Sequence, residues 1–576
     1  MSRPHHELRP SQFLMTFGPG SILETPSGPV IVKSVGELFT SLREDPQRFE
    51  ILDDRLSRSI LGGARIVRIP SNAELGVPDG EPIYPTFRFP FWALCTKHPL
   101  VQILYSALTG CPQCGPLPNW QRVEKAGREA IRFVLACKGG HLDEVHWERL
   151  VPHVRPGCSP DHYIWGGGGR ALRQVTITCP TCGAVENMGQ AYRRSWPCRG
   201  KFPELGQTTP SSSCTKEARI SQRGAANLRM PVVVAALTIL DMPGQLHSVL
   251  SDRRVQSAAL TLQQIGRLNQ QDFFQAVGPQ IPPSSLQFLQ QVPWPDLLTA
   301  INDLLQASRS NQTSLFDQEF DRLVRAASGG APAVPNSQIG APPLFEVRLQ
   351  DVRRFAGPAS RMNLRVTPVS RLRMVVVQRG YQRVDPQTGD EVSVAFQQAG
   401  QNWYPGAELF GEGIFIDLDG RPLSLGGKRV QAWSARNVAD QLSRSEPAHV
   451  WWHSLSHRLL QALSIDSGYS SAAIRERVYI PDDAAGHVSG GLLLYTVQPG
   501  GDGTLGGLVA LVDRFHMILR SALLDVDTCS NDPLCEEAPS AGAEGSACYS
   551  CMLVSETSCE HRNLGLDRLL LADNLP

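Results

Sequence analysis

The sequence predicts a multidomain protein of mixed α and β structure (α/β, mixed α+β). It also predicts zinc-ribbon-like modules in the N-terminal half and a zinc-stapled α/β domain at the C-terminus. Three observations predict this class. Cysteines cluster tightly in both halves of the chain. A Gly/Pro/Ser-rich segment, residues 327–343, separates a helical pattern from a second set of strands. In that second set, a strand, a glycine-rich turn and a helix precede the last cysteine cluster.

Composition places the chain among globular proteins. It has 576 residues, of which 41% are hydrophobic, and 55 basic residues balance 55 acidic ones. This length predicts several domains, and zero net charge excludes a polybasic protein but not a local basic face. The N-terminus has no apolar core of the signal-peptide kind, and the longest apolar stretch, from Met230, is far shorter than the ~20 residues of a membrane span. We therefore expect a cytoplasmic protein with no membrane partner.

Changes of pattern along the chain predict five consecutive segments. These are a β-rich segment (1–80), a double zinc-ribbon-like region (81–224), a helical region (225–326), the linker (327–343) and a C-terminal α/β domain (344–576) whose zinc-binding module spans about 440–576. The helical region is predicted from apolar residues at helix spacing, such as Leu297, Leu298 and Ile301.

Within the C-terminal domain, short apolar runs predict strands and apolar residues at helix spacing predict helices. The predicted strands are LRMVVV (372–377), GIFIDL (413–418) and LLLYTV (492–497), and the predicted helices lie at 454–463 and about 508–524. The turn PGGDGTLGG after the last strand lacks the lysine and hydroxyl residue of a nucleotide-binding phosphate loop.

Fourteen cysteines in a reducing compartment are more often metal ligands than disulfides. The first cluster, Cys95-x2-His98 followed by Cys111-x2-Cys114, has the spacing of a zinc ribbon, in which two knuckles supply four tetrahedral ligands. The second cluster has one tight knuckle, Cys179-x2-Cys182, and is completed in our prediction by Cys198 and Cys214.

The third cluster lies near the end of the chain. Cys548-x2-Cys551 forms its knuckle, Cys559 is the third predicted ligand, and the fourth is either Cys529 or Cys535, with Cys529 preferred. Sites closed by four such ligands leave no position for water or substrate, so we expect about three zinc ions that stabilise the fold. The remaining cysteines, Cys137, Cys158 and the unused one of Cys529 and Cys535, are interpreted as buried side chains.

Motifs for catalysis are incomplete. The chain has no G-x4-G-K-[ST] motif. His453-x3-His457 is spaced as in a zinc protease, but Ser454 stands where the catalytic Glu is required. His146-Trp147-Glu148 before the Cys179 knuckle imitates a zinc deaminase, although the knuckle differs from that motif and further cysteines compete to close the site. Cys137-x3-His141, with His146, is interpreted as a polar patch at a strand end.

From Arg353 to Arg383 the sequence has eight arginines and no acidic residue. Alternate residues of a strand share one face, so Arg371, Arg373 and Arg379 are predicted to contact DNA phosphates. The alternative is a solvated strand face.

Five stretches together resemble the DrmB family, the helicase-associated component of the bacterial anti-phage system DISARM. They are LRPSQFLMTFGPGSI, RFVLACKGGHLDEVHW, GEGIFIDL, SGYSSAAIRERVYI and ACYSCMLVSETSCEHRNLGLDRLL. From LLLYTV onward the chain is also similar to the zinc-binding domain that ends MrfA-like superfamily 2 helicases. That resemblance implies Cys529, Cys548, Cys551 and Cys559 as zinc ligands, with Cys535 as an extra thiol.

The resemblance implies a function as a motor-less subunit. Such a subunit is not an enzyme; it partners the helicase DrmA and helps to bind and process DNA. The alternative from a different class is a stand-alone metal-dependent hydrolase, a nuclease or deaminase, that acts on nucleic acid.

Overall fold

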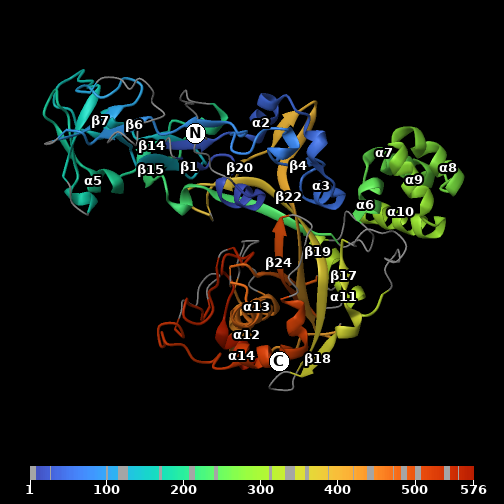
Figure 1. Ribbon diagram of the computed structural model, residues 1–576. Helices are drawn as coiled ribbons and strands as arrows, with labels where there is room; N and C mark the ends of the chain where they lie inside the picture. Colours follow the sequence, from blue (N-terminus) through green and yellow to red (C-terminus); the bar gives the residue numbers. More distant parts are fainter. Residues whose placement is uncertain are drawn as a thin grey trace. The chain divides into compact units, whose positions relative to one another are not determined.

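The structure is a computed structural model (Figure 1). It describes residues 8–25, 28–98, 101–114, 128–167, 171–206, 214–238, 244–309, 314–330, 344–356, 362–386, 388–419, 421–436, 446–470, 472–481, 489–499, 507–537, 545–555 and 557–576. Most of the predicted linker and of the glycine-rich turn after LLLYTV lies outside these ranges.

The chain forms two compact units, neither of which is contiguous in sequence. Unit 1 contains Met1–Ile51, Ala64–Val234 and Val376–Ala407, and unit 2 contains Leu52–Gly63, Ala235–Val375 and Glu408–Pro576. Three strands contribute residues to both units: β16 (Met230–Leu237), β19 (Asn363–Gln382) and β22 (Gln401–Asp417). The fold class predicted from the sequence, mixed α and β structure in several parts, is confirmed.

Unit 1 consists mainly of short antiparallel strands. Its strands are β1 (Ile22–Thr25), β2 (Gly28–Val32), β3 (Glu50–Ile51), β4 (Arg65–Arg68), β5 (Thr86–Arg88), β6 (Trp92–Cys95), β7 (Gln102–Ser106), β8 (Arg128–Ala130), β9 (Phe133–Cys137), β10 (Leu142–Glu144), β11 (His162–Gly166), β12 (Thr176–Thr178), β13 (Val185–Asn187), β14 (Trp196–Pro197), β15 (Glu217–Gln222), β20 (Val392–Ser393) and β21 (Phe396–Gln398). Its helices are α1 (Pro10–Gln12), α2 (Val35–Leu42), α4 (Trp147–Leu150) and α5 (Met188–Arg193).

Three sheets of unit 1 carry the strands around the first cysteine clusters. Their strand orders are β1-β2-β5, β10-β9-β15-β14 and β13-β12-β11-β7-β6-β8. The last two sheets share a core that contains Phe133, Trp147 and Ile177, each at most 1% exposed. The ends of their strands therefore hold the cysteine-bearing turns in fixed positions.

The N-terminal segment is less purely β than the sequence analysis predicts. Helix α2 lies between β2 and β3, because Val35, Leu38 and Phe39 recur at helical spacing and are all fully buried. This 3.6-residue period is present in the sequence but covers only two turns, which is too short to stand out beside the neighbouring strand patterns.

Unit 2 contains most of the helices. They are α3 (Asp54–Ser59), α6 (Gly244–Leu250), α7 (Arg253–Gln264), α8 (Gln270–Val277), α9 (Pro283–Gln291), α10 (Trp294–Arg309), α11 (Leu315–Ala327), α12 (Lys428–Ser434), α13 (Pro447–Asp466), α14 (Phe515–Leu523), preceded by a 3-10 turn at Val509–Arg514, and α15 (Arg568–Asp573). Its own strands are β17 (Glu346–Val347), β18 (Arg353–Ala356), β23 (Arg475–Tyr479) and β24 (Gly491–Pro499). Helices α6 to α10 gather into a bundle (Figure 1) around a core that includes Phe273, Leu289 and Leu297.

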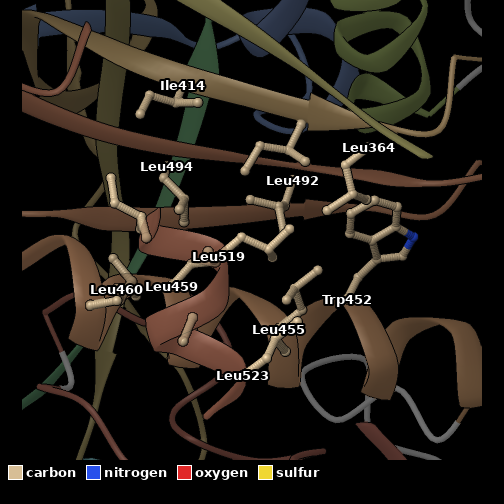
Figure 2. Packing of buried hydrophobic residues seen from close by; sticks show 14 of the residues in the cluster. Leu364, Ile414, Trp452, Leu455, Leu459, Leu460, Leu492, Leu494, Leu519 and Leu523 are labelled. Carbon is tan, nitrogen blue, oxygen red and sulfur yellow. The ribbon is translucent and has the colours of Figure 1, made fainter. Parts of the chain in front are cut away.

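Helix α13 is the centre of the largest core in unit 2. Its leucines face strands β22 and β24 on one side and helix α14 on the other (Figure 2). Leu455, Leu459 and Leu463 are fully buried at i, i+4 spacing, as the sequence analysis predicts for a helix here. The predicted strands 372–377, 413–418 and 492–497 fall within or overlap β19, β22 and β24 and are confirmed.

This core predicts an asymmetric response to alanine substitution along α13. Leu459→Ala removes a fully buried side chain and should lower the free energy of unfolding by about 2 to 5 kcal/mol. Ile465, on the same helix but 81% exposed, is the matched control, and Ile465→Ala should change stability by less than about 0.5 kcal/mol. Denaturant unfolding followed by the fluorescence of the buried Trp451 and Trp452 measures both. Equal effects would contradict the placement of the helix.

Candidate metal centres

Within the described residues, five groups of four side chains hold their ligand atoms within 4.8 Å of one another. They are Cys95/His98/Cys111/Cys114, Cys137/His141/Cys198/Cys214, His153/Cys158/Cys179/Cys182, Cys529/Cys535/Cys548/Cys551 and His453/His457/Glu476/Cys559. Tetrahedral zinc with ligand bonds of about 2.0 to 2.3 Å separates its ligand atoms by about 3.3 to 3.8 Å, so the clusters have the right size. Four groups contain only Cys and His, the ligand types of structural zinc, and they indicate multiple zinc sites.

The first group joins the four residues that the sequence analysis places together. Cys95 ends strand β6, and Cys111 and Cys114 lie in the turn that follows β7, which pairs with β6. The Sγ atoms of Cys95 and Cys114 are 3.9 Å apart, and Nε2 of His98 lies 3.3 Å from Sγ of Cys111. The chain reverses after β7, where the N–H groups of Thr109 and Gly110 donate to the carbonyl of Ser106, and this turn returns the second knuckle toward Cys95. Two knuckles that meet in this way resemble a zinc ribbon.

The second predicted quartet is divided between two groups. Cys198 and Cys214 lie with Cys137 and His141, where Sγ of Cys137 is 3.4 Å from Sγ of Cys198 and 3.2 Å from Nδ1 of His141. Strand pairing explains this: β15 pairs with both β9 and β14, with Ala218 opposite Cys137 and opposite Trp196. The turns before β15, after β14 and after β9 consequently meet.

Cys179 and Cys182, the tight knuckle, lie with His153 and Cys158. Sγ of Cys158 is 3.6 Å from Sγ of Cys179, and Nδ1 of His153 is 3.4 Å from Sγ of Cys182. Cys179 directly follows β12, whose antiparallel partner β11 is entered from the loop that carries Cys158. The structure thus holds one more Cys/His group than the three zinc sites predicted, because four residues outside the prediction complete two groups.

In the last cysteine cluster both Cys529 and Cys535 lie within ligand distance of the Cys548–Cys551 knuckle. Sγ of Cys529 lies 3.4 Å from Sγ of Cys548, and Sγ of Cys535 lies 3.7 Å from Sγ of Cys551. Cys559, the predicted third ligand, is not in this group but among His453, His457 and Glu476. Its distance along the chain from the Cys548 knuckle resembles a ligand spacing, but the turn between them carries it toward α13 and β23 instead.

Hydrogen bonds acidify one thiol in each of three groups. The Cys198 thiol donates to Cys137 and, against the effect of burial, lowers the pKa of Cys137 to about 5. Bonds with the Ala184 backbone and with His153 lower the pKa of Cys182 to about 6. Burial, the largest effect, raises the pKa of Cys548, but bonds from Asn531 and Cys529 and neighbouring groups outweigh it and bring that pKa to about 6. A second thiol of each group shifts the other way: burial and the neighbouring cysteines raise the pKa of Cys158 to about 11, and the pKa values of Cys198 and Cys551 are raised as well. Thiolate is the form that binds zinc, and each group therefore presents one thiolate beside thiols that release their protons when metal binds.

The deaminase-like and protease-like motifs do not form the metal sites that those classes of enzyme require. Nε2 of His146 lies 3.0 Å from a carboxylate oxygen of Asp143, and His146 belongs to none of the five groups. The Cys179–Cys182 knuckle already forms a complete group of four with His153 and Cys158. His453 and His457 do share a metal-sized cluster, but its third member is Glu476 from strand β23 and not a residue of the same helix.

Carboxylates from other parts of the chain neutralise most of the arginines in the run from Arg353 to Arg383. Among its described members, with Arg361 outside the described residues, six form ion pairs: Arg353–Asp513, Arg354–Asp419, Arg365–Asp417, Arg373–Glu408, Arg379–Glu391 and Arg383–Glu204. Arg373 is 3% exposed and also donates to Thr238, so it does not fit the predicted DNA-contacting set. Arg379 keeps 40% of its side chain exposed, and the guanidinium of Arg371 lies over the ring of Phe410.

Comparisons with known proteins agree with the resemblance noted in the sequence. Residues 9–230 match a family model described as a domain of unknown function (DUF8724), and residues 455–552 match the MrfA Zn-binding domain. The chain is 26% identical over 514 residues to the DISARM protein DrmB of Bacillus paralicheniformis, a match that covers 82% of this chain and 84% of that protein.

The chain is also similar over part of its length to a solved structure, that of the DUF1998 helicase MrfA bound to DNA. It is 14% identical, with a TM-score of 0.21, and the match covers 34% of this chain and 21% of that chain. The chain thus spans about a fifth of that helicase's length, and a TM-score this low carries no argument. No helix in the described ranges is long and apolar enough to cross a membrane.

The division of the second quartet is directly testable by counting zinc. Cys182→Ser and Cys198→Ser should each remove one zinc ion per chain, and the double variant should remove two, because the two thiols belong to different groups. Cys198→Ser combined with Cys214→Ser is the matched control and should remove only one. Elemental analysis of purified protein measures this. Loss of a single ion from the Cys182/Cys198 double variant would mean that the two cysteines share a site.

Proposed function

We propose that the protein is a non-catalytic, zinc-binding subunit of a DISARM-type anti-phage complex, in which it partners a DrmA-type helicase and helps to bind DNA. The observation that carries the proposal is the similarity to DrmB, which extends over 82% of this chain. The match of residues 455–552 to the MrfA Zn-binding domain supports a zinc-stabilised module related to a helicase accessory domain.

The metal groups support a structural role for zinc. Each of the four Cys/His groups supplies four protein ligands, which leaves no coordination position for water or substrate. The sequence also has no phosphate-binding motif with the lysine that reaches the β- and γ-phosphates. These two features favour a non-catalytic subunit over a stand-alone hydrolase.

Contacts with DNA would have to come from arginines that can exchange their partners. The Arg379–Glu391 pair is bidentate but partly exposed, and such pairs contribute only about 0 to 1 kcal/mol, so a phosphate can replace the carboxylate. Arg371 is half-buried against Phe410 and forms a second candidate. Arg373 is buried in its pair with Glu408 and is excluded from the proposed contacts.

The first test concerns catalysis and partnership. The purified full chain should hydrolyse no ATP, and it should co-purify with a DrmA-type helicase when both are expressed together. ATP hydrolysis by the pair should disappear when the lysine of the helicase's own phosphate loop is replaced. Turnover by this chain alone, retained through purification, would refute the proposed role, as would failure of the two proteins to associate.

The second test uses charge changes of opposite sign at one ion pair. Arg379→Ala should weaken DNA binding by the assembled pair and reduce the salt slope of binding by about one unit, which corresponds to one lost phosphate contact. Glu391→Gln frees the same arginine and should tighten binding. Arg371→Ala tests the other candidate in the same way. Fluorescence anisotropy at several salt concentrations measures all three variants.

Arg373→Ala provides the structural control for these measurements. Because its guanidinium is buried between Glu408 and Thr238, its loss should lower thermal stability and leave the salt slope unchanged. A normal salt slope in both Arg371→Ala and Arg379→Ala would show that DNA is held elsewhere.

A further inference from the structure

We infer that His453, His457, Glu476 and Cys559 form a fifth zinc site, separate from the four Cys/His groups. All four side chains are buried, and the two histidines and Glu476 are completely so. Nitrogen, oxygen and sulfur donors in one cluster of this size are a ligand set that zinc accepts. The site would be closed and structural, because protein atoms supply every ligand and solvent has no access.

Three separate parts of unit 2 bring these ligands together. His453 and His457 lie one turn apart on α13, so both rings leave the same face of the helix. Glu476 comes from β23, and its backbone N–H donates to the carbonyl of Ser558 at 3.0 Å, which places Cys559 beside it. Nε2 of His453 is 2.9 Å from Oε1 of Glu476 and 3.2 Å from Sγ of Cys559.

The protonation of the two rings follows from their outer partners. Nδ1 of His457 lies 2.9 Å from the carbonyl oxygen of Met552, and Nδ1 of His453 lies 3.3 Å from that of Gly565. A carbonyl oxygen can only accept, so each Nδ1 carries the hydrogen, and in a neutral ring each Nε2 presents its lone pair. Histidines that ligate metals show this same arrangement, with the second nitrogen donating to a carbonyl or carboxylate.

Cys559 is also arranged as a thiolate ligand. Its Sγ lies 3.3 Å from the backbone nitrogen of His561 and 3.2 Å from that of Asn563, so two N–H groups donate to the sulfur. The other oxygen of Glu476 accepts from the hydroxyl of Ser456, which fixes the carboxylate with Oε1 toward the rings, 3.2 Å from Nε2 of His457. Four electron-pair donors consequently point at one another in an interior that water does not reach.

Such a cluster is costly unless something positive lies among its members. Burying a carboxylate is strongly unfavourable without a paired charge, and lone pairs that face one another gain no hydrogen bond. A zinc ion satisfies all four donors at once. The competing arrangement is a proton-sharing network in which one ring is charged, and it predicts a protein that binds no additional metal here.

The proposed ion would tie the leucine-lined helix to the cysteine-rich end of the chain. Met552, whose carbonyl orients His457, directly follows Cys551 of the four-cysteine group. One short segment thus contributes a ligand to one metal group and orients a ligand of the other. The fifth site would hold α13 and β23 against that segment.

Zinc content of the full-length protein tests the inference without helicase or DNA, so its failure is distinct from failure of the proposed function. After reconstitution with zinc and removal of excess metal, the wild-type chain should contain one ion more than the four Cys/His groups account for. Cys559→Ser and Cys551→Ser should each remove one ion, and their combination should remove two. Cys559→Ser combined with His457→Gln should remove only one, because both residues bind the same ion.

His449→Gln is the matched control, because His449 is buried one turn before His453 on α13 but lies outside the group. It should leave the zinc count unchanged. If the Cys559 or His457 variants fail to fold, the wild-type count still decides: no ion beyond the four Cys/His groups overturns the inference. Loss of a single ion from the Cys551/Cys559 double variant would also overturn it, since both thiols would then serve one site.

Discussion

Metal coordination by side chains at strand ends and turns is the constraint on which unit 1 depends. Its strands around the first three metal groups are short, β14 having two residues and β15 six, and the sheets that they form are small. Short strands bury little apolar surface, so the free energy of metal binding becomes part of the folding free energy. Metal ligands at the ends of β9, β14 and β15 thus fix these turns in addition to the apolar core on which their strands pack.

Strand register also explains how much of the metal sites could be predicted. The first group lies in one hairpin and the turn that follows it, so its ligands are close in sequence and the spacing alone identifies them. The second group depends on the pairing of β9 with β15, which lie far apart in the sequence, with Cys137 opposite Ala218. The third group forms where the consecutive strands β11 and β12 pair, with Thr178 opposite Ile164, and it takes two ligands, His153 and Cys158, that belong to no tight knuckle. Sequence spacing alone identifies neither set of four. The Cys137-x3-His141 spacing is a sequence signal for the second group, although the sequence pattern is equally typical of a polar patch at a strand end.

In unit 2 the sequence also predicts the elements better than it predicts which side chains the packing brings together. The apolar pattern predicted α13 and the strands β22 and β24, because burial on one face repeats with the period of the element. The spacing of His453 and His457 is also visible in the sequence, but the protease motif that shares this spacing needs an acid on the same helix. The acid, Glu476, lies on the neighbouring strand, and only the packing of α13 on β23 brings it close.

The arginine run shows why local charge patterns predict surfaces poorly. No acidic residue lies between Arg353 and Arg383, yet carboxylates from far along the chain neutralise most of the described arginines. Arg383, for instance, is buried beside Glu204 and donates to the carbonyls of Gly20, Gly140 and Leu228. A guanidinium has five donors where the ammonium of lysine has three, so Arg383 can bind these three carbonyls and Glu204 at once. In a chain with equal numbers of acidic and basic residues, the arginines of a strand can therefore form buried ion pairs or bind phosphate. The burial of each guanidinium decides between these two roles.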